Sequence, residues 1–247
     1  MLALRSPLLR KMVFGLLMSV GLGASAPETP KPGVKLYVVA LTGADLYAAP
    51  SFTAKVARRL PLGAVVNVRQ TVASDDVKRI GAGLALPGDW LKITTPAYTG
   101  YLFSSDLSPR KPALKKSHGG MSYIDLLGPK KSSRTEMELI KAKSRPGEYA
   151  LKDITEYANA TVTMTSFDSC FDHEYVFRRV SLNEVYHHMI SHYAGYEGQK
   201  LMQPRLLSKK GNVYTFTCGY GESDATQELH LTIHKNGTLV ISSFDCT

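Results

Sequence analysis

The sequence predicts two folded parts, a small all-β barrel over residues 34–107 and an α+β domain with an antiparallel sheet over residues 146–247. In the first part, short runs of strand-forming residues alternate with turn signals. A segment rich in Pro, Gly and Lys follows over residues 108–145. The last part combines one amphipathic helical pattern with several strand patterns. A length of 247 residues suits two small domains.

The barrel prediction depends on short alternating runs. The strand patterns lie at residues 36–41, 66–68, 90–93 and 100–103. Turn signals separate them, including Ala49-Pro50-Ser51 and Pro87-Gly88-Asp89. Strands this short with close turns favour a closed barrel over an open sheet.

The composition of residues 108–145 predicts a basic linker. They hold ten cations and three acids, and so most of the chain's net charge of +9. A solvated flexible linker is one interpretation, and contact with an anionic surface such as wall polymers, lipid head groups or an acidic protein is the other. The short apolar piece 123–127 could dock on a neighbouring element. The overall composition, with 44% hydrophobic and 21% charged residues, excludes a wholly disordered, collagen-like or multi-span membrane protein.

The N-terminus has the pattern of an export signal. Three basic residues precede the apolar stretch Met12–Leu22, and Ala24-Ser25-Ala26 supplies a small-residue cleavage site. Eleven residues at ~1.5 Å per residue cannot cross a hydrocarbon core of ~30 Å. We therefore expect a signal peptide over residues 1–26, no transmembrane segment after cleavage, and a periplasmic or extracellular location. In an exported protein, nucleic acid is not an expected partner.

The last part combines helix and strand patterns. Residues 148–158 have near-helical spacing of apolar residues. A second helix is expected to begin at Ser181, because Glu184 three residues on completes a capping box. Strand patterns follow, at residues 161–165, 175–177, 200–207, 212–218, 227–234 and 238–245.

Histidines are the candidate metal ligands. His188 and His192 are four residues apart and share one helix face, a spacing that could hold zinc with a third ligand. The residue after His188 is Met189, whereas the metallopeptidase signature needs Glu there. The favoured interpretation is a polar helix face with partly exposed histidines. His230 and His234 share one face of a strand, where two histidines could bind a metal or sense pH, but the favoured interpretation is that they are solvated surface residues. No cofactor is expected.

Three cysteines in an exported chain predict one disulfide and one spare thiol. If the last strands form a meander, Cys218 and Cys246 flank strand 227–234, roughly 9–10 Å apart and beyond disulfide reach. The favoured pair is therefore Cys170 with Cys218, and the second choice is Cys170 with Cys246. Acidic neighbours would raise the pKa of Cys170, which argues against a nucleophilic cysteine.

Two stretches of the first part resemble the bacterial SH3-like (SH3b) family. Residues 45–68 resemble its first half, from Asp45-Leu46-Tyr47 to Val65-Val66-Asn67-Val68. Gly88-Asp89-Trp90 and Thr99-Gly100-Tyr101 match the Gly-Asp-Trp and Thr-Gly-aromatic motifs of its second half. The sequence departs from the family at the first turn, which lacks Asn-Val-Arg-x-Gly-Pro, and at the long connection 71–87. The resemblance implies an SH3-like barrel with a binding role, typically toward cell-wall peptides or envelope proteins.

An aromatic surface is the candidate ligand site of this part. Trp90, the only tryptophan, falls on the strand face opposite its apolar neighbours. With Tyr47, Tyr98 and Tyr101 it could form an exposed groove that recognises a peptide or glycan. The alternative interpretation is that Trp90 caps the barrel core, and both remain open.

These observations predict an exported, non-catalytic bacterial protein whose SH3b-like module recognises cell-wall peptide, glycan or an envelope protein. The C-terminal domain has no assigned activity. Two alternatives remain: a cell-wall hydrolase targeted by the SH3b-like module, and a secreted inhibitor or host-interaction protein. An enzyme is not favoured, because the sequence holds no His-Glu-x-x-His or Gly-x-Ser-x-Gly motif and no Cys/His/Asn order.

Overall fold

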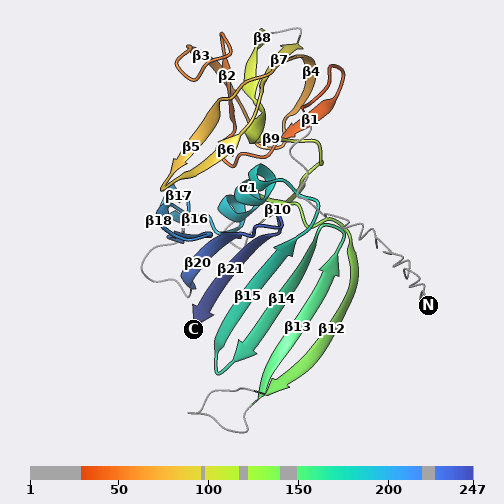
Figure 1. Cartoon of the computed structure of the whole chain (residues 1–247), viewed down its shortest axis with the longest axis vertical. Coiled ribbons are helices and arrows are strands. Elements are labelled where there is room, and N and C mark those ends of the chain that lie inside the picture. Colours follow the sequence, from red (N-terminus) through yellow and green to blue (C-terminus); the bar gives the residue numbers. More distant parts are fainter. Residues whose placement is uncertain (1–28, 96–97, 117–121, 140–148, 219–225, 247) are drawn as a thin grey trace, which may run out of the picture.

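A computed structural model describes residues 29–95, 98–116, 122–139, 149–218 and 226–246, which form several antiparallel sheets and one α-helix (Figure 1). The two largest sheets have seven and eight strands. No helix within these residues has the length and apolar character needed to cross a membrane.

The seven-stranded sheet has the order β3-β2-β8-β7-β4-β1-β9. Its strands are β1 (Lys35–Val38), β2 (Ala44–Tyr47), β3 (Val56–Leu60), β4 (Val65–Val72), β7 (Trp90–Thr95), β8 (Tyr98–Phe103) and β9 (Leu107–Ser108), with the 3-10 helix η1 (Ser104–Asp106) before β9. The predicted short strands are therefore present. β4 pairs with β1 through its first half and with β7 through its second, and an irregularity lies between Val68 and Gln70. Among the described strands no pairing joins β3 to β9, so the hydrogen-bonded sheet is open rather than closed.

The inward residues of this sheet form a core of their own, because apolar side chains alternate along each strand. The core contains Leu36, Val38, Leu46, Val66, Val68, Leu91, Ile93, Leu102 and Leu107, all buried.

A hairpin connects this sheet to the second core. It consists of β5 (Val77–Gly81) and β6 (Leu84–Pro87), and it occupies most of the long connection 71–87. Leu84 is buried in the core beneath the eight-stranded sheet, and Ile80 packs against the same core. The long connection that departs from the SH3b pattern thus forms a hairpin that packs against the second core.

The eight-stranded sheet has the order β12-β13-β14-β15-β21-β20-β19-β18. Its strands are β12 (Lys130–Leu139), β13 (Tyr149–Tyr157), β14 (Ala160–Phe167), β15 (Cys170–Phe177), β18 (Leu206–Lys210), β19 (Val213–Phe216), β20 (Thr226–Ile233) and β21 (Leu239–Cys246). Two small hairpins accompany it, β10 (Ala113–Lys116) with β11 (Ser122–Asp125) and β16 (Gly195–Glu197) with β17 (Lys200–Met202).

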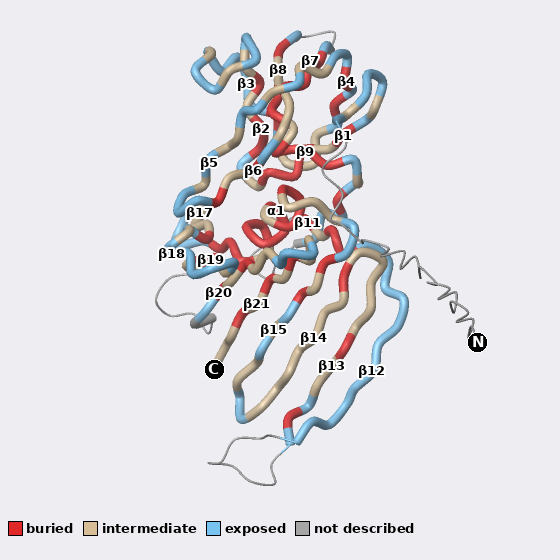
Figure 2. The backbone as a smooth tube through the Cα atoms, in the orientation of Figure 1, coloured by how far each residue is buried: buried red, intermediate tan, exposed pale blue. Residues whose placement is uncertain are grey.

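Helix α1 (Leu182–His192) packs on one face of the eight-stranded sheet. Val185 and Met189 are fully buried against Leu229, Leu231 and Ile241 of β20 and β21. The predicted capping box is confirmed, because the Ser181 hydroxyl and the Glu184 carboxylate each accept from the other's backbone N–H. Figure 2 shows the buried residues concentrated around α1, between the two large sheets.

Residues 108–145 are not a linker where the structure describes them. They contribute β10, β11 and β12, and Ile124 and Leu126 are buried. The Ile124 N–H donates to Ser191 Oγ of α1 at 2.8 Å, so the piece 123–127 docks as predicted. β12 has a polar sequence because it is an edge strand that is exposed throughout, and composition alone does not distinguish such a strand from a linker.

The helical spacing over residues 148–158 is misleading, because this segment is strand β13. Both faces of β13 are only partly covered, so its apolar residues do not follow a strict period of two. The strand patterns from 161–165 to 238–245 lie within or overlap strands.

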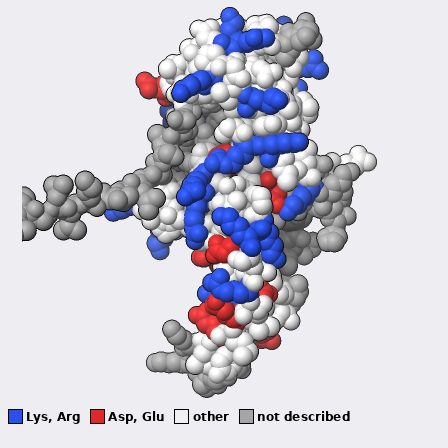
Figure 3. Space-filling view, turned by 90° about the vertical axis from the view of Figure 1, so that its right-hand side faces the viewer, with Lys and Arg blue, Asp and Glu red and all other residues white. Residues whose placement is uncertain are grey.

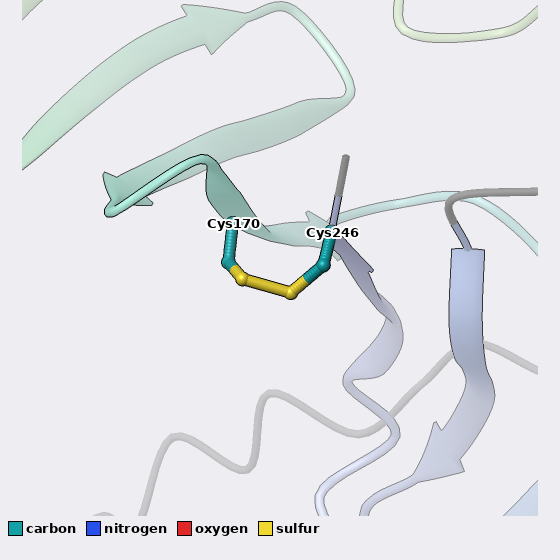
Figure 4. The surroundings of a disulfide bond; sticks show 2 residues. All are labelled: Cys170 and Cys246. Carbon is teal, nitrogen blue, oxygen red and sulfur yellow. A yellow bond between two sulfur atoms is a disulfide. The ribbon is translucent and has the colours of Figure 1, made fainter.

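The disulfide joins Cys170 to Cys246 and not to Cys218 (Figure 4). The two cysteines are direct cross-strand partners on β15 and β21. Cys218 follows β19, which lies three strand positions from β15, or roughly 14 Å at ~4.8 Å per strand. The favoured pairing was wrong because the sequence did not show that β15 lies beside the last strand.

Candidate functional site

The predicted aromatic surface is largely internal at Trp90, whose exposed fraction is 1%. Its Nε1 donates to Asp76 Oδ2 at 2.7 Å. Its ring centroid lies 4.8 Å from that of Phe52 and 5.2 Å from that of Phe103. Phe52, in the β2–β3 turn, and the segment before β5 therefore cover a side chain that the strand pattern alone places on an outer face.

The three tyrosines predicted with Trp90 do not form one surface. Tyr47 and Tyr101 are half-buried and lie opposite each other on β2 and β8. Tyr98 lies on the other face of β8, where it packs against the core. Phe52, which no sequence motif indicates, is 38% exposed beside Tyr47. Only a small aromatic surface remains, made by Tyr47, Phe52 and Tyr101.

Glu184 is the centre of a buried polar network where the first sheet, β10 and α1 meet. Its carboxylate accepts from the Ser108 hydroxyl, the Ser181 N–H and Arg110 Nη1, the last at 2.9 Å to each oxygen. Glu184 is 2% exposed. The network is fully paired and connects structural elements, so we assign it a structural role.

A second polar contact joins α1 to the first sheet. His187 Nε2 lies 3.3 Å from Asp106 Oδ1, and Lys78 Nζ donates to the same carboxylate at 2.7 Å. Burial acts to raise the pKa of Asp106, but the hydrogen bond from His187 and the Lys78 ammonium hold it below its ordinary value.

His188 and His192 are stacked in the interior, with ring centroids 5.8 Å apart. His188 is 2% exposed and its Nδ1 accepts from the Leu126 N–H. Burial lowers the pKa of His188 to about 3 and that of His192 to about 4. His188 is thus a core residue and not a partly exposed one. Among the described residues no group of three or more His, Cys, Asp or Glu could hold a metal ion, so the zinc hypothesis has no third ligand there.

These two histidines predict a loss of stability in mild acid. Their folded pKa values lie below the ordinary 6.5, so the unfolded chain binds more protons as the pH falls. The free energy of unfolding is therefore at its full value above pH 6.5 and falls below it by about 1.4 kcal/mol per pH unit for each histidine. Urea unfolding between about pH 7.5 and about pH 5 measures this slope.

His188→Asn is the matched variant for this prediction, because its amide oxygen can replace the Nδ1 acceptor. It should remove the part of the slope that His188 contributes, and His234→Asn, the same substitution at an exposed position, is the matched control. The charged and titratable groups around the pair, Lys115, Asp125, His173, Tyr175 and Asp245, are retained in both variants. Equal slopes in the wild type and His188→Asn would contradict the assignment.

Four exposed apolar side chains of the described residues gather at the far end of β12 and β13. Met137, Leu139, Tyr149 and Leu151 are 73%, 47%, 58% and 49% exposed. Met137 lies opposite Leu151 and Leu139 opposite Tyr149, so all four share one sheet face. We call these four residues the distal patch.

The distal patch continues the face that α1 covers. Leu151 lies opposite Ser166, Ser166 lies opposite Phe171, and Phe171 shares its face of β15 with the buried Tyr175 and Phe177. The helix covers only the part of this face near Tyr175. The remaining described part of this face also contains Thr135, Asp153, Ser166 and His173, and the distal patch is its exposed apolar end.

A shallow pocket of about 580 Å³ lies beside the patch. Tyr149, Leu151, Phe167 and Phe171 supply its apolar walls, and Ser166 with the β14–β15 turn residues Asp168 and Ser169 supplies polar groups. Asp168 and Ser169 in this turn have positive φ values of 48° and 63°, as in tight hairpin turns. An apolar floor with a polar rim can accommodate large side chains of a ligand and hydrogen-bond its polar groups.

The described basic residues of 108–145 lie before or on β10 and on β12. Figure 3 shows Lys and Arg in a band down one side of the molecule, with Asp and Glu among them toward the lower end. Several of these cations have acidic partners: Arg110 pairs with Glu184, Lys115 with Asp125, and Arg134 with Glu136. The band therefore carries charges of both signs.

Comparisons with protein-family models, with curated proteins and with solved structures found no match to this chain. The assignment of a function therefore depends on the chemistry of these surfaces.

Proposed function

We propose that the chain is an exported, non-catalytic binding protein that holds an apolar segment of an envelope peptide or protein on the distal patch. The observation that carries this proposal is the exposure of four large apolar side chains on one sheet face beside a pocket. Contiguous exposed apolar surface with a polar rim is typical of interaction sites. The Glu184 network, by contrast, is buried and paired, so it offers no such surface.

Export is supported by the signal pattern of residues 1–26 and by the disulfide. A disulfide persists in oxidising compartments and is rare in the cytosol. Cys170 and Cys246 face each other on neighbouring strands, so the fold itself favours their pairing.

We also propose that residues 34–107 form an SH3b-like module in a modified form. The order of its short strands and the Gly88-Asp89-Trp90 and Thr99-Gly100-Tyr101 motifs support this. With Trp90 covered, its ligand surface is reduced to Tyr47, Phe52 and Tyr101. The distal patch is the larger apolar surface, and we therefore assign the main contact to it.

The proposal is tested with an apolar fluorescent probe, N-phenyl-1-naphthylamine, and the mature chain. Leu151 is half-exposed and lines the pocket, so Leu151→Ser removes contact area without opening a core cavity. We expect it to weaken probe binding about tenfold, the equivalent of about 1.4 kcal/mol of lost apolar burial. Fluorescence titration measures the effect.

Leu207→Ser is the matched control, because Leu207 is 60% exposed on β18 at the other edge of the same sheet. It should bind the probe like the wild type. A wild type that does not bind, or equal losses in both variants, would rule out the distal patch as the site. The same three proteins are then pelleted with cell-envelope fragments, where selective loss with Leu151→Ser would identify the envelope as the source of the ligand.

A further inference from the structure

The eight-stranded sheet has two edges of different character. β18 is five residues long, has an irregular register between Leu206 and Ser208, and ends in two lysines. Such features protect an edge from pairing with another strand. β12 is ten residues long and exposed along its whole length. Its register has an irregularity between Lys130 and Ser132 and is regular over the eight residues from Ser132 to Leu139, and no described strand pairs with its outer side. A long edge of this kind presents unpaired backbone N–H and C=O groups to a further strand.

The charges of β12 are also unusual for a protected edge. Edge strands commonly carry charges of one sign, which repel a second copy. Here Arg134 and Glu136 lie side by side on the face away from the distal patch, with Arg134 Nε 2.7 Å from Glu136 Oε1. Opposite charges two residues apart on one strand are self-complementary, because an antiparallel copy centred between them places each beside its counterpart.

We propose that β12 pairs antiparallel with β12 of a second copy of this chain, about a two-fold axis through Thr135. In this register Arg134 of each copy lies opposite Glu136 of the other, which gives two cross-strand ion pairs. Thr135 lies opposite its own counterpart, and Ser132 lies opposite Glu138.

The neighbouring symmetric registers are disfavoured by charge. An axis through Arg134 would place the two Arg134 guanidinium groups opposite each other, and an axis through Glu136 would do the same for two carboxylates. Like charges directly opposite on adjacent strands are destabilising. An axis through Ser133 avoids this but leaves Met137 and Leu139 outside the paired segment. The Thr135 register therefore combines the longest overlap with no like-charge pair.

Such pairing gives a two-fold dimer with one continuous sheet across both copies. Because the axis is perpendicular to the sheet, both distal patches lie on the same face. Their Met137 residues would be roughly 14 Å apart, from ~3.4 Å per residue along the strand and ~4.8 Å between strands. The dimer would thus present two patches to one extended ligand. The pairing itself does not depend on the proposed function.

Cysteine cross-linking tests the register. In Thr135→Cys the two new cysteines face each other across the axis, with Cβ atoms about 4.5–5.5 Å apart, close enough to form a disulfide. In the control Ser132→Cys they are roughly 20 Å apart along the strands. We expect mild oxidation to give a covalent dimer with Thr135→Cys and none with Ser132→Cys. Both variants retain Cys218, so its contribution is the same. Equal yields, or none with Thr135→Cys, would overturn the register.

Charge exchange tests the pairing in the native thiol background. Arg134→Glu and Glu136→Arg should each weaken dimerisation about tenfold or more in sedimentation velocity, because each places like charges opposite one another twice. The double variant Arg134→Glu/Glu136→Arg should restore the wild-type dissociation constant. A wild type that is monomeric at every concentration, or four proteins that dimerise equally, would refute the proposal. Probe binding at Leu151 reports the proposed function separately in all four proteins.

Discussion

Removing the Cys170–Cys246 disulfide should lower the free energy of unfolding by about 4–5 kcal/mol. The bond closes a loop across a sequence separation of 76 residues. In the chain-entropy description, releasing a loop of this length gives the unfolded state about that much free energy. The effect is large because β15 and β21 are neighbours in the sheet although far apart in the sequence.

The measurement is chemical unfolding of the Cys170→Ser/Cys246→Ser variant. Replacing both cysteines avoids a new unpaired thiol. Dithiothreitol should destabilise the wild type by the same amount and leave the double variant unchanged. Cys218→Ser is the control, since Cys218 lies outside this bond and is only partly buried. Equal unfolding midpoints for the oxidised wild type and the double variant would show that the bond adds no stability.

Glu184→Ala should cost about 3–4 kcal/mol, or roughly 10 °C in Tm. The carboxylate is buried and is the partner of the Arg110 guanidinium, the Ser108 hydroxyl and the Ser181 N–H. Its loss leaves Arg110 without a counter-charge and Ser108 without an acceptor at an exposed fraction of 0%. Arg110 retains contact with solvent, which limits the cost to the lower part of the range for buried pairs.

Ser181→Ala separates the helix cap from the ion pair. It removes the capping hydrogen bond from the Glu184 N–H and the bond that the Ser181 hydroxyl donates to the Glu184 carboxylate, but it leaves the contact with Arg110, and it should cost only about 1 kcal/mol. Glu184→Gln should lie between the two, because its amide keeps one acceptor oxygen. Thermal unfolding of the three variants gives the order. If Glu184→Ala cost no more than Ser181→Ala, the contact with Arg110 would contribute nothing to stability.

Local patterns in the sequence predicted the elements whose environment is regular. Leu229 and Leu231 are buried and alternate with the half-buried His230 and Thr232, as the period of two predicted, because one face of β20 is covered more fully than the other. The capping box at Ser181 was found because its two hydrogen bonds are local. The same reasoning failed for β12 and β13, whose faces are partly exposed on both sides.

The candidate site depended on contacts that no local pattern contains. The burial of Trp90 follows from Phe52 and Asp76, which are far from it in the sequence. The burial of His188 follows from β11, which pairs in a segment that looked like a linker. The distal patch could not be predicted from the sequence, because its four residues lie on one sheet face only once β12 pairs with β13.

The β5–β6 hairpin has a consequence for how the chain can be divided. A cut after residue 107 would separate Leu84 from the core that buries it and Asp106 from His187. In such a fragment Leu84, which is buried in the intact protein, would be exposed to solvent and could promote aggregation. If the first sheet were transferred to another protein, by recombination or by engineering, either α1 would have to be transferred with it or the β5–β6 hairpin would have to be shortened.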